Sequence, residues 1–536
     1  MRHISDLPYK VLELILFKAA ATPSYRLHEW KYKLPLLAVC RVWTKLVVGA
    51  VFNHVYVEFA TALRYHLDTH LLWTSNADLF ISRGCMLLAR RLTIEWEEMV
   101  TPACLQRIVL DILNLDRVDW QHINSLTFTS SLWTFNRFVE PVSQDKRAVT
   151  DIARTVQYFA QNLRNIVDLN WYDLRRGSTG RYLYTQLVTY YGHQLQALRA
   201  QGSTPLPISC FSRRMRVLDL TLDSSATRVL PSICSETLVA LRLEDVPHNF
   251  AWHHFCYEKF TRPIYFNRLT ILHIGFEGRG KALTEGEIED KTGLGAHNCD
   301  KLSFPMLKQL SIANCTPDCD LLYTDIPFRE LEKVHLSGPI FCICHCSRLK
   351  LTCVGHLDVN ITPSDLGDTA DIYRVTNHLF TDICIGRTAS LRIIIDWFIL
   401  DPELMRWVNL TTLDIGKVRY TTICRAIGQL PKLCQLTINR LEFRDMATHD
   451  STVDLPLFTS ADPMLIWGER LATLFVRNFN KSCPLMDCVG GIQALILHAG
   501  AIKELVVPRL ANQHMFTFID MFKDKHPHLA NLTVHR

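Results

Sequence analysis

A short phrase that recurs along the chain constrains the fold more than any other feature of the sequence. Each copy holds an aliphatic residue, variable residues, a second aliphatic residue, a polar residue and a further apolar one. Successive side chains of a β-strand point to opposite faces, so this alternation predicts a short strand with one buried face. The copies lie at residues 88–94, 123–128, 215–220, 238–243, 269–274, 307–312, 331–336, 410–415, 433–438, 471–476, 492–497, 502–507 and 529–534.

One such strand cannot bury its apolar face alone, whereas a stack of them builds a continuous core. The phrase is the strand signature of leucine-rich repeats. We therefore expect an α/β fold, an irregular leucine-rich-repeat solenoid with parallel strands on the concave side and helices on the convex side. Residues at helical spacing between the copies are expected to form the convex layer, namely Val149, Ile152, Ala153, Val156, Phe159, Leu163, Ile423, Ala426, Ile427 and Leu430.

The repeats are degenerate. Their spacing is irregular, about 20 to 40 residues, and the Asn that regular repeats use in their turn is mostly missing. The phrase is weakest in residues 170–210 and 340–400.

The first sixty residues differ from the repeats. Val11, Leu12 and Ile15 recur at helical spacing behind Ser5 and Asp6, which can cap a helix. A second apolar group follows at 36–43 and ends in Trp43. These apolar residues exceed what a few short helices need for themselves, so we expect some of them to contact a partner. The simpler alternative is an N-terminal cap that shields the first repeat.

This segment resembles the F-box, a family that opens with Leu-Pro, continues with an apolar helix and closes on Val-Cys-Arg-x-Trp. The resemblance covers residues 4–57, and the segment 22–33 is longer than the family usually has there. It implies that the segment binds a Skp-type adaptor and, through it, a cullin. On the family's pattern, adaptor binding falls to Leu7, Pro8, Val11, Leu12, Ile15, Val39, Cys40 and Trp43.

The expected domain organisation follows from these two patterns. An F-box-like helical domain covers 1–59, connecting helices cover 60–90, and the solenoid covers 91–536. The F-box-like segment should finish a helix at 44–52 and pass into a strand at 54–59, where apolar residues alternate. The connecting helices carry Leu63, Tyr65, Leu67, Leu71 and Leu72.

Charge and cysteine content bound the partners and the compartment. A net charge of +5 from 58 basic and 53 acidic residues gives no sign of a nucleic-acid or membrane partner. The N-terminus lacks the apolar run of a secretory signal, so we expect the 18 cysteines to stay reduced in the cytoplasm or nucleus. Arg41 and Lys45 interrupt the most apolar stretch, 34–52, and we expect no transmembrane helix.

An enzyme signal lies at Gly275–Lys281, where glycines and a lysine after a predicted strand have the spacing of a phosphate-binding loop. The next residue is Ala282, whereas the motif needs a hydroxyl there to hold Mg²⁺. The segment that follows is acidic and would repel a phosphate. We favour a long polar loop over 275–300 and keep a nucleotide hydrolase that uses Lys281 as a remote alternative.

Two clusters contain possible metal ligands or nucleophiles. Cys342, Cys344, His345 and Cys346, with Cys353 and His356 nearby and Cys315 and Cys319 in the previous repeat, are ligand types that zinc accepts. Their spacing lacks the two separated pairs of a structural zinc site, which favours reduced thiols near a turn. His253, His254 and Cys256 more often belong to a loop or a helix face than to a nucleophile pair.

Aromatic residues at or just beyond the predicted strands could line the concave surface or fill the core. They are Trp96, Trp171, Phe276 and Trp397.

The favoured hypothesis from the sequence is a non-catalytic substrate-recognition subunit of an SCF-type (Skp adaptor–cullin–F-box) ubiquitin ligase, in which the repeats bind a protein substrate. It implies no catalytic, cofactor-binding or metal-binding residue and no cofactor. The alternative is a leucine-rich-repeat interaction scaffold without a ubiquitin role, which shares the fold and differs only in what the N-terminal segment does.

Overall fold

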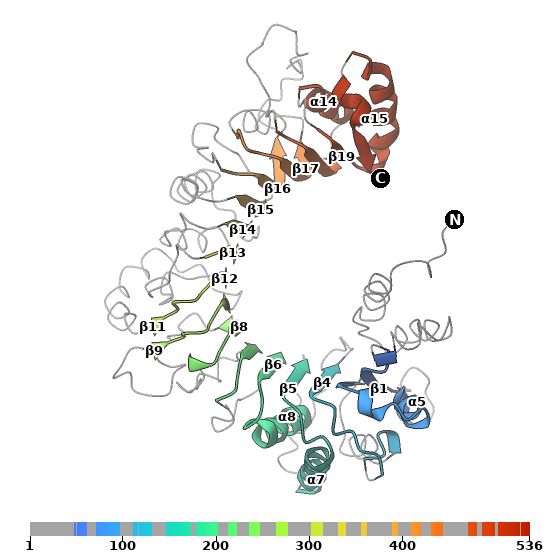
Figure 1. The fold of residues 1–536 in the computed structure, drawn as a ribbon, viewed down its shortest axis with the longest axis vertical. Coiled ribbons are helices and arrows are strands. Elements are labelled where there is room, and N and C mark those ends of the chain that lie inside the picture. Colours follow the sequence, from blue (N-terminus) through green and yellow to red (C-terminus); the bar gives the residue numbers. More distant parts are fainter. Residues whose placement is uncertain are drawn as a thin grey trace. The chain divides into compact units, whose positions relative to one another are not determined.

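The computed structural model describes about half of the chain, mainly the strands and the segments beside them (Figure 1). The described residues are 48–49, 51–61, 71–96, 111–115, 117–130, 146–172, 178–201, 213–221, 235–246, 264–276, 302–314, 331–338, 355–361, 389–394, 409–419, 430–442, 470–479, 485–498, 502–525 and 527–535. The chain divides into two compact units, Met1–Phe266 (unit 1) and Asn267–Arg536 (unit 2).

Unit 1 is built on a sheet in which β1, β3, β4, β5, β6, β7 and β8 follow one another in parallel. The strand β2 pairs antiparallel with the other edge of β1. The elements are β1 (His54–Thr61), β2 (Leu71–Ser75), α5 (Ala77–Ser82), η3 (Met86–Leu88), β3 (Arg91–Trp96), β4 (Ser125–Ser130), α7 (Lys146–Asn162), β5 (Asp168–Tyr172), α8 (Ser178–Tyr191), β6 (Ala197–Gln201), β7 (Val217–Thr221), β8 (Ala240–Val246) and β9 (Ile264–Tyr265).

Unit 2 repeats the same plan, with a parallel ladder from β10 through β12 to β20. Two longer helices lie near its C-terminal end. The elements are β10 (Ile271–Phe276), β11 (Leu302–Ser303), β12 (Gln309–Ala313), β13 (Lys333–Gly338), β14 (His356–Ile361), β15 (Ser390–Ile394), β16 (Thr412–Arg419), β17 (Gln435–Glu442), β18 (Thr473–Phe479), α14 (Leu485–His498), β19 (Glu504–Val506), α15 (Arg509–Phe522), η12 (Pro527–Asn531) and β20 (Thr533–His535).

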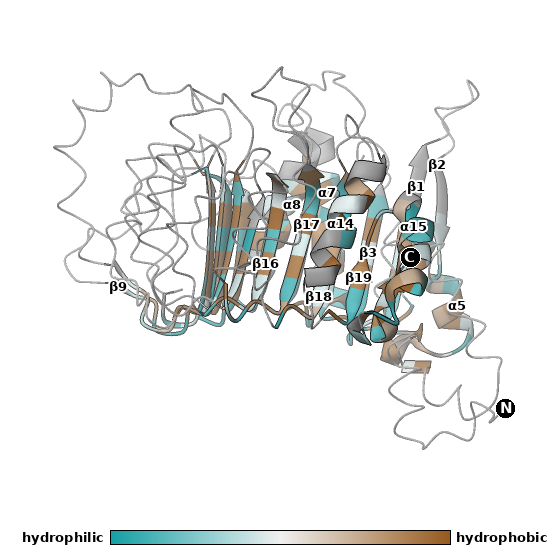
Figure 2. Cartoon of the chain, turned by 90° about the horizontal axis from the view of Figure 1, so that it is seen from above, coloured by the Kyte–Doolittle hydropathy of each residue, from teal (hydrophilic) through white to brown (hydrophobic). Residues whose placement is uncertain are grey.

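The core of each unit consists of aliphatic residues that stand opposite one another from strand to strand. In unit 1, Leu92, Leu126 and Leu169 are aligned across β3, β4 and β5, and all are fully buried. In unit 2, Leu413, Leu436 and Leu474 are aligned across β16, β17 and β18 in the same way. Burial of one such side chain stabilises the fold by about 1.5–3 kcal/mol. Figure 2 shows the resulting alternation of hydrophobic and hydrophilic residues along β16 and β17.

A repeated backbone contact joins each repeat to the next. Just before a strand, one carbonyl oxygen accepts hydrogen bonds from two consecutive N–H groups of the following repeat. The Asn124 oxygen accepts from Val167 and Asp168 at 2.9 and 3.0 Å, and the Thr411 oxygen accepts from Cys434 and Gln435 at 2.8 and 3.0 Å. This contact gives hydrogen-bond partners to backbone groups at the turn that would otherwise lack them. It also holds neighbouring strands in register.

Helices cover one face of the unit 1 sheet. Phe159 of α7 packs edge-on against Phe128 of β4, and Tyr184 of α8 packs edge-on against Trp171 of β5. Figure 1 shows α7 and α8 on the same side of these strands. The buried residues of the strands therefore face the helices, and the polar residues between them face the other way.

Most of the predicted strands are confirmed, and each unit is a leucine-rich-repeat solenoid. Every predicted copy except one coincides with a strand or begins just before one. The helix α7 confirms the amphipathic segment from Val149 to Phe159. Val48, Gly49 and Val51 are helical, and β1 confirms the strand expected at 54–59. Residues 423–427 lie outside the described part of the chain.

Two predictions about secondary structure were wrong. The copy at 492–497 lies inside α14, because Cys488, Val489, Ile492 and Ile496 are buried together at helical spacing. Leu71 and Leu72, expected in a connecting helix, begin β2, where Leu71 stands opposite Thr61 of β1.

Four strands lie in the segments where the phrase is weakest. They are β5 and β6 in unit 1 and β14 and β15 in unit 2. Of the described helices, none has the length and apolar character required to cross a membrane.

Candidate functional site: the polar open face of the sheets

The face of each sheet that carries the polar residues is here called the open face. Its central row consists of the residue between the two buried positions of each strand. In unit 1 this row is Tyr56, Thr93, Thr127, Asn170, Arg199, Asp219 and Arg242. In unit 2 it is His273, Ser311, His335, Asp358, Arg392, Asp414, Thr437 and Phe475.

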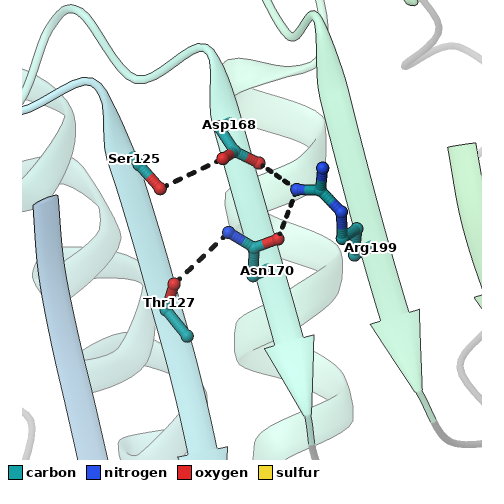
Figure 3. A network of polar contacts seen from close by, with 5 residues as sticks. All are labelled: Ser125, Thr127, Asp168, Asn170 and Arg199. Atoms are coloured by element: carbon teal, nitrogen blue, oxygen red, sulfur yellow. Dashed lines mark hydrogen bonds and ion pairs between the residues drawn. The ribbon is translucent and has the colours of Figure 1, made fainter. Parts of the chain in front are cut away.

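In unit 1 a polar network joins β4, β5 and β6 (Figure 3). One nitrogen of Arg199, Nη1, donates to Asp168 Oδ1 and to Asn170 Oδ1, both at 2.9 Å. The Ser125 hydroxyl donates to the other carboxylate oxygen of Asp168 at 3.2 Å, and Asn170 Nδ2 donates to Thr127 Oγ1 at 3.3 Å. These contacts hold the Arg199 guanidinium against the sheet, so its position is defined before a partner arrives.

A second charged group lies farther along the unit 1 row. Arg242 of β8 donates through Nε and Nη2 to Glu244 Oε1, at 3.2 and 2.8 Å, and its Nε lies 3.9 Å from Asp219 Oδ1 of β7. At the other end, His54 Nε2 lies 2.7 Å from Thr93 Oγ1, and the His54 and Tyr56 rings are stacked with centroids 3.9 Å apart. The unit 1 face thus combines acids, bases and hydroxyls with the buried ring of Tyr56 beside the half-buried His54.

In unit 2 the central row contains alternating charges. His335 Nδ1 lies 3.1 Å from Asp358 Oδ2, and Arg392 Nη1 lies 3.7 Å from the same oxygen. On its other side, Arg392 Nε lies 3.4 Å from Asp414 Oδ2, and Asn439 Nδ2 donates to Asp414 Oδ1 at 3.3 Å. Four neighbouring strands, β13 to β16, therefore contribute one charged or ionisable residue each to a continuous row.

The two acids of this row have opposite pKa shifts. Burial alone would raise the pKa of Asp358, but the hydrogen bond with His335 and the nearby Arg392 charge outweigh burial and hold it below its ordinary value. Burial raises the pKa of Asp414, although Arg392 and Arg477 act in the opposite direction. Asp358 is thus the better stabilised of the two carboxylates.

Two imidazole–hydroxyl pairs lie among the described residues of the unit 2 face. His273 Nδ1 lies 2.7 Å from Ser311 Oγ, and His356 Nδ1 lies 2.8 Å from Ser390 Oγ. Each pair joins neighbouring strands. Asp358, the carboxylate nearest His356 on β14, is hydrogen bonded to His335 instead. Within the residues that the structure describes, no carboxylate therefore orients His356 as a catalytic base, and we interpret both pairs as cross-strand contacts.

The structure places few of the residues singled out from the sequence. The expected adaptor-binding residues all lie outside the described part of the chain, as do the cysteines of the possible zinc cluster, His253, His254, Cys256 and Trp397. Gly275 and Phe276 end β10, and the rest of the glycine-rich loop also lies outside. His356 is part of β14 and contacts Ser390.

Two of the aromatic candidates are core residues. Trp171 is fully buried between Phe128 and Tyr184, and Phe276 is buried as well. Neither lies on the open face. Trp96 is the last residue of β3.

Several polar residues of the open face lie on strands that the sequence did not predict. Asp168, Asn170, Arg199, Asp358 and Arg392 all lie on the four strands in the weak segments. In β5 and β6 the phrase is present but harder to recognise: 166–171 ends in Trp171 and 195–200 ends in Ala200, whereas the other copies end in Leu, Ile, Val or Phe.

Comparison with known proteins yields structural likeness only. No family model matches the chain, and no curated protein matches it. A leucine-rich-repeat protein of Leptospira interrogans is 13% identical, with 84% of this chain and 91% of that one covered and a TM-score of 0.25. An internalin of Listeria monocytogenes is 11% identical, with 83% and 86% covered and a TM-score of 0.25. At that TM-score neither likeness supports the fold, which rests on the strand ladder itself.

Proposed function

We propose that the chain is a substrate-recognition subunit of an SCF-type ubiquitin ligase, with residues 4–57 binding a Skp-type adaptor and the open face binding a protein substrate. The observation that supports the substrate half is the polar open face, where side chains from successive strands are held in place by their neighbours. Support for the adaptor half comes from the sequence alone, through Leu7-Pro8 and Val39-Cys40-Arg41-x-Trp43. Such a subunit acts in the cytoplasm or nucleus.

In this function the chain performs no chemistry of its own. It holds a lysine of the substrate near the charged ubiquitin-conjugating enzyme, which raises their effective concentration. A pre-positioned polar face suits that task, because ordering costs at the moment of binding are reduced.

The alternative function is a protein-interaction scaffold without a ubiquitin role. The open face supports it equally well, because both functions require a protein-binding surface. They differ only in whether the N-terminal segment binds an adaptor.

The double substitution Leu7→Ala/Pro8→Ala tests the adaptor half. We expect it to abolish pull-down of a purified Skp-type adaptor by the full-length chain, because it removes apolar contact area at the start of the segment. A matched control is Leu87→Ala/Pro305→Ala, which changes an exposed leucine and an exposed proline elsewhere and should leave pull-down intact. The unfolding temperature of each variant confirms that the repeats are folded.

Undiminished capture by Leu7→Ala/Pro8→Ala would contradict the ligase assignment. The scaffold would then be the better description.

A further inference from the structure

The open face of unit 2 between β13 and β18 presents a group of basic side chains, here called the basic patch. Its residues are Lys333, His335, His356, Arg392 and Arg477. Lys333 lies one position before a buried valine, and Arg477 one position after a buried valine, so strand alternation places both on the open face. The pKa shifts agree with this placement, because the Lys333 charge acts on His356 and the Arg477 charge acts on Asp414.

The acids of the same region lie deeper than the bases. The side chain of Asp358 is 10% exposed and that of Asp414 is 18% exposed, whereas the Arg392 side chain between them is 41% exposed. Lys333 and Arg477 are exposed. A partner that approaches this face therefore meets guanidinium and ammonium groups before it meets a carboxylate.

The electrostatic environment of His356 agrees with this arrangement. Burial first, and then the positive charge of Lys333, lower the pKa of His356, although Asp358 acts in the opposite direction. The imidazole is therefore neutral at physiological pH, and Lys333 and Arg392 carry the positive charge there.

The charged groups in the central row of the unit 1 open face are paired with neighbouring charges. Asp168 and Arg199 are 31% and 33% exposed and lie 2.9 Å apart. Arg242 is 52% exposed, contacts Glu244 at 2.8 Å and lies 3.9 Å from Asp219. Within the described residues, both arginines of this row are therefore already paired with acids.

Among the described residues, the exposed acids nearest the basic patch do not neutralise it. Glu332, just before β13, pairs with Lys308 at 2.7 Å, and Glu504 belongs to β19, beyond the patch. Within the described residues, neither Lys333 nor Arg477 takes part in an ion pair. Both side chains can therefore form an ion pair with a carboxylate of a partner.

We propose that the basic patch binds an extended acidic segment of a protein partner, rich in Asp and Glu. The strands β13 to β18 are successive neighbours, and the register aligns Lys333 with Thr473, four residues before Arg477. A spacing of about 4.8 Å per strand and about 3.3 Å per residue therefore separates Lys333 from Arg477 by about 27 Å along a diagonal of the sheet. An extended peptide covers that distance with about eight residues. The inference rests on the proposed function, since it names the chemical class of the substrate that the repeats hold.

The test uses the full-length chain and a fluorescent decapeptide of alternating glutamate and serine, with a glutamine–serine decapeptide for comparison. We expect the glutamate peptide to bind at least about tenfold more tightly, and its affinity to fall as the ionic strength rises from about 0.05 to about 0.5 M, because salt screens exposed charges. Fluorescence anisotropy measures both.

The variant Lys333→Gln/Arg477→Gln should weaken binding of the glutamate peptide about tenfold, as expected for the loss of two exposed charge contacts. The matched control Arg509→Gln/Lys523→Gln removes the same charge at the two ends of α15, from its first residue and its C-cap, away from the patch, and should change affinity less than about twofold.

Three results would overturn the inference: equal affinity for the glutamate and glutamine peptides, equal weakening by the two double variants, or tighter binding of a single-stranded nucleic acid than of the glutamate peptide. The adaptor pull-down is scored separately. A chain that captures the adaptor but fails these peptide tests keeps the proposed function and loses the acidic substrate class.

Discussion

At the scale of single residues, Asp358 and Asp414 show how one row produces two different carboxylates. Both flank Arg392, and both are largely buried. Asp358 also contacts His335, and the combined contacts lower its pKa, whereas burial dominates at Asp414 and raises its pKa. The charge of Asp358 therefore stabilises the folded state, and that of Asp414 is tolerated at a cost.

The two substitutions Asp358→Asn and Asp414→Asn should separate these roles. We expect Asp358→Asn to lower the free energy of unfolding at pH 7 by about 1–3 kcal/mol, because His335 loses a charged hydrogen-bond partner and Arg392 loses an ion-pair partner. Asp414→Asn should cost less than half as much. Urea unfolding of the full-length variants measures both losses of unfolding free energy. Equal losses would contradict the conclusion that the charge of Asp358 stabilises the fold more than that of Asp414.

The pH dependence of stability follows from the lowered pKa of Asp358. A carboxyl whose pKa is lowered on folding adds stability above its unfolded pKa of about 3.9, and that stability is lost as the pH falls further. The acid-side loss of stability should therefore be shallower in Asp358→Asn than in the parent chain.

At the scale of elements, the local pattern predicts strands well except where the same apolar residues also fit the spacing of a helix. The segment 492–497 has the strand phrase, but its apolar residues also continue the helical spacing of Cys488 and Val489, and α14 forms. The opposite error concerns β5, which was not predicted although Ile166, Leu169 and Trp171 carry the phrase. A Trp at the final apolar position, where the other copies hold an aliphatic residue or Phe, makes the phrase harder to recognise, yet Trp171 is fully buried in the core.

Glycines at two sites offer a test at this scale. Gly490 lies in α14 with nothing within 4 Å of an added Cβ, so Gly490→Ala should raise the free energy of unfolding by about 0.5–1 kcal/mol. Gly338 ends β13 with φ +136°, and its Cβ would lie 2.9 Å from Asn314 Oδ1. Gly338→Ala should therefore be destabilising. Thermal unfolding compares the two, and a gain in both would contradict the strain at Gly338.

At the scale of the whole molecule, stability in each unit should be local, because a strand pairs only with its immediate neighbours in the ladder. Trp171, fully buried on β5, contacts Phe128 of β4 and Tyr184 of α8. The loss of such a residue opens neighbouring strands without requiring the rest of the ladder to open.

The substitution Trp171→Ala should cost about 3–5 kcal/mol and speed amide hydrogen exchange in β4, β5 and β6 while leaving β16, β17 and β18 unchanged. Tyr158→Ala on α7, which removes an exposed ring, is the control and should leave exchange unchanged throughout. Faster exchange in the unit 2 strands would show that the ladder opens as one cooperative unit.

The sequence by itself determined the repeated strands, the parallel solenoid and the amphipathic helix α7, because each follows from the spacing of apolar residues within a few positions. Only the tertiary structure decided which polar residues meet. Asp358 of β14 contacts His335 of β13 and Arg392 of β15. Arg199 of β6 contacts Asp168 and Asn170 of β5. Such pairs depend on the register between strands, which is set by backbone hydrogen bonds between repeats and by the packing of the core, and no local pattern along the chain encodes it.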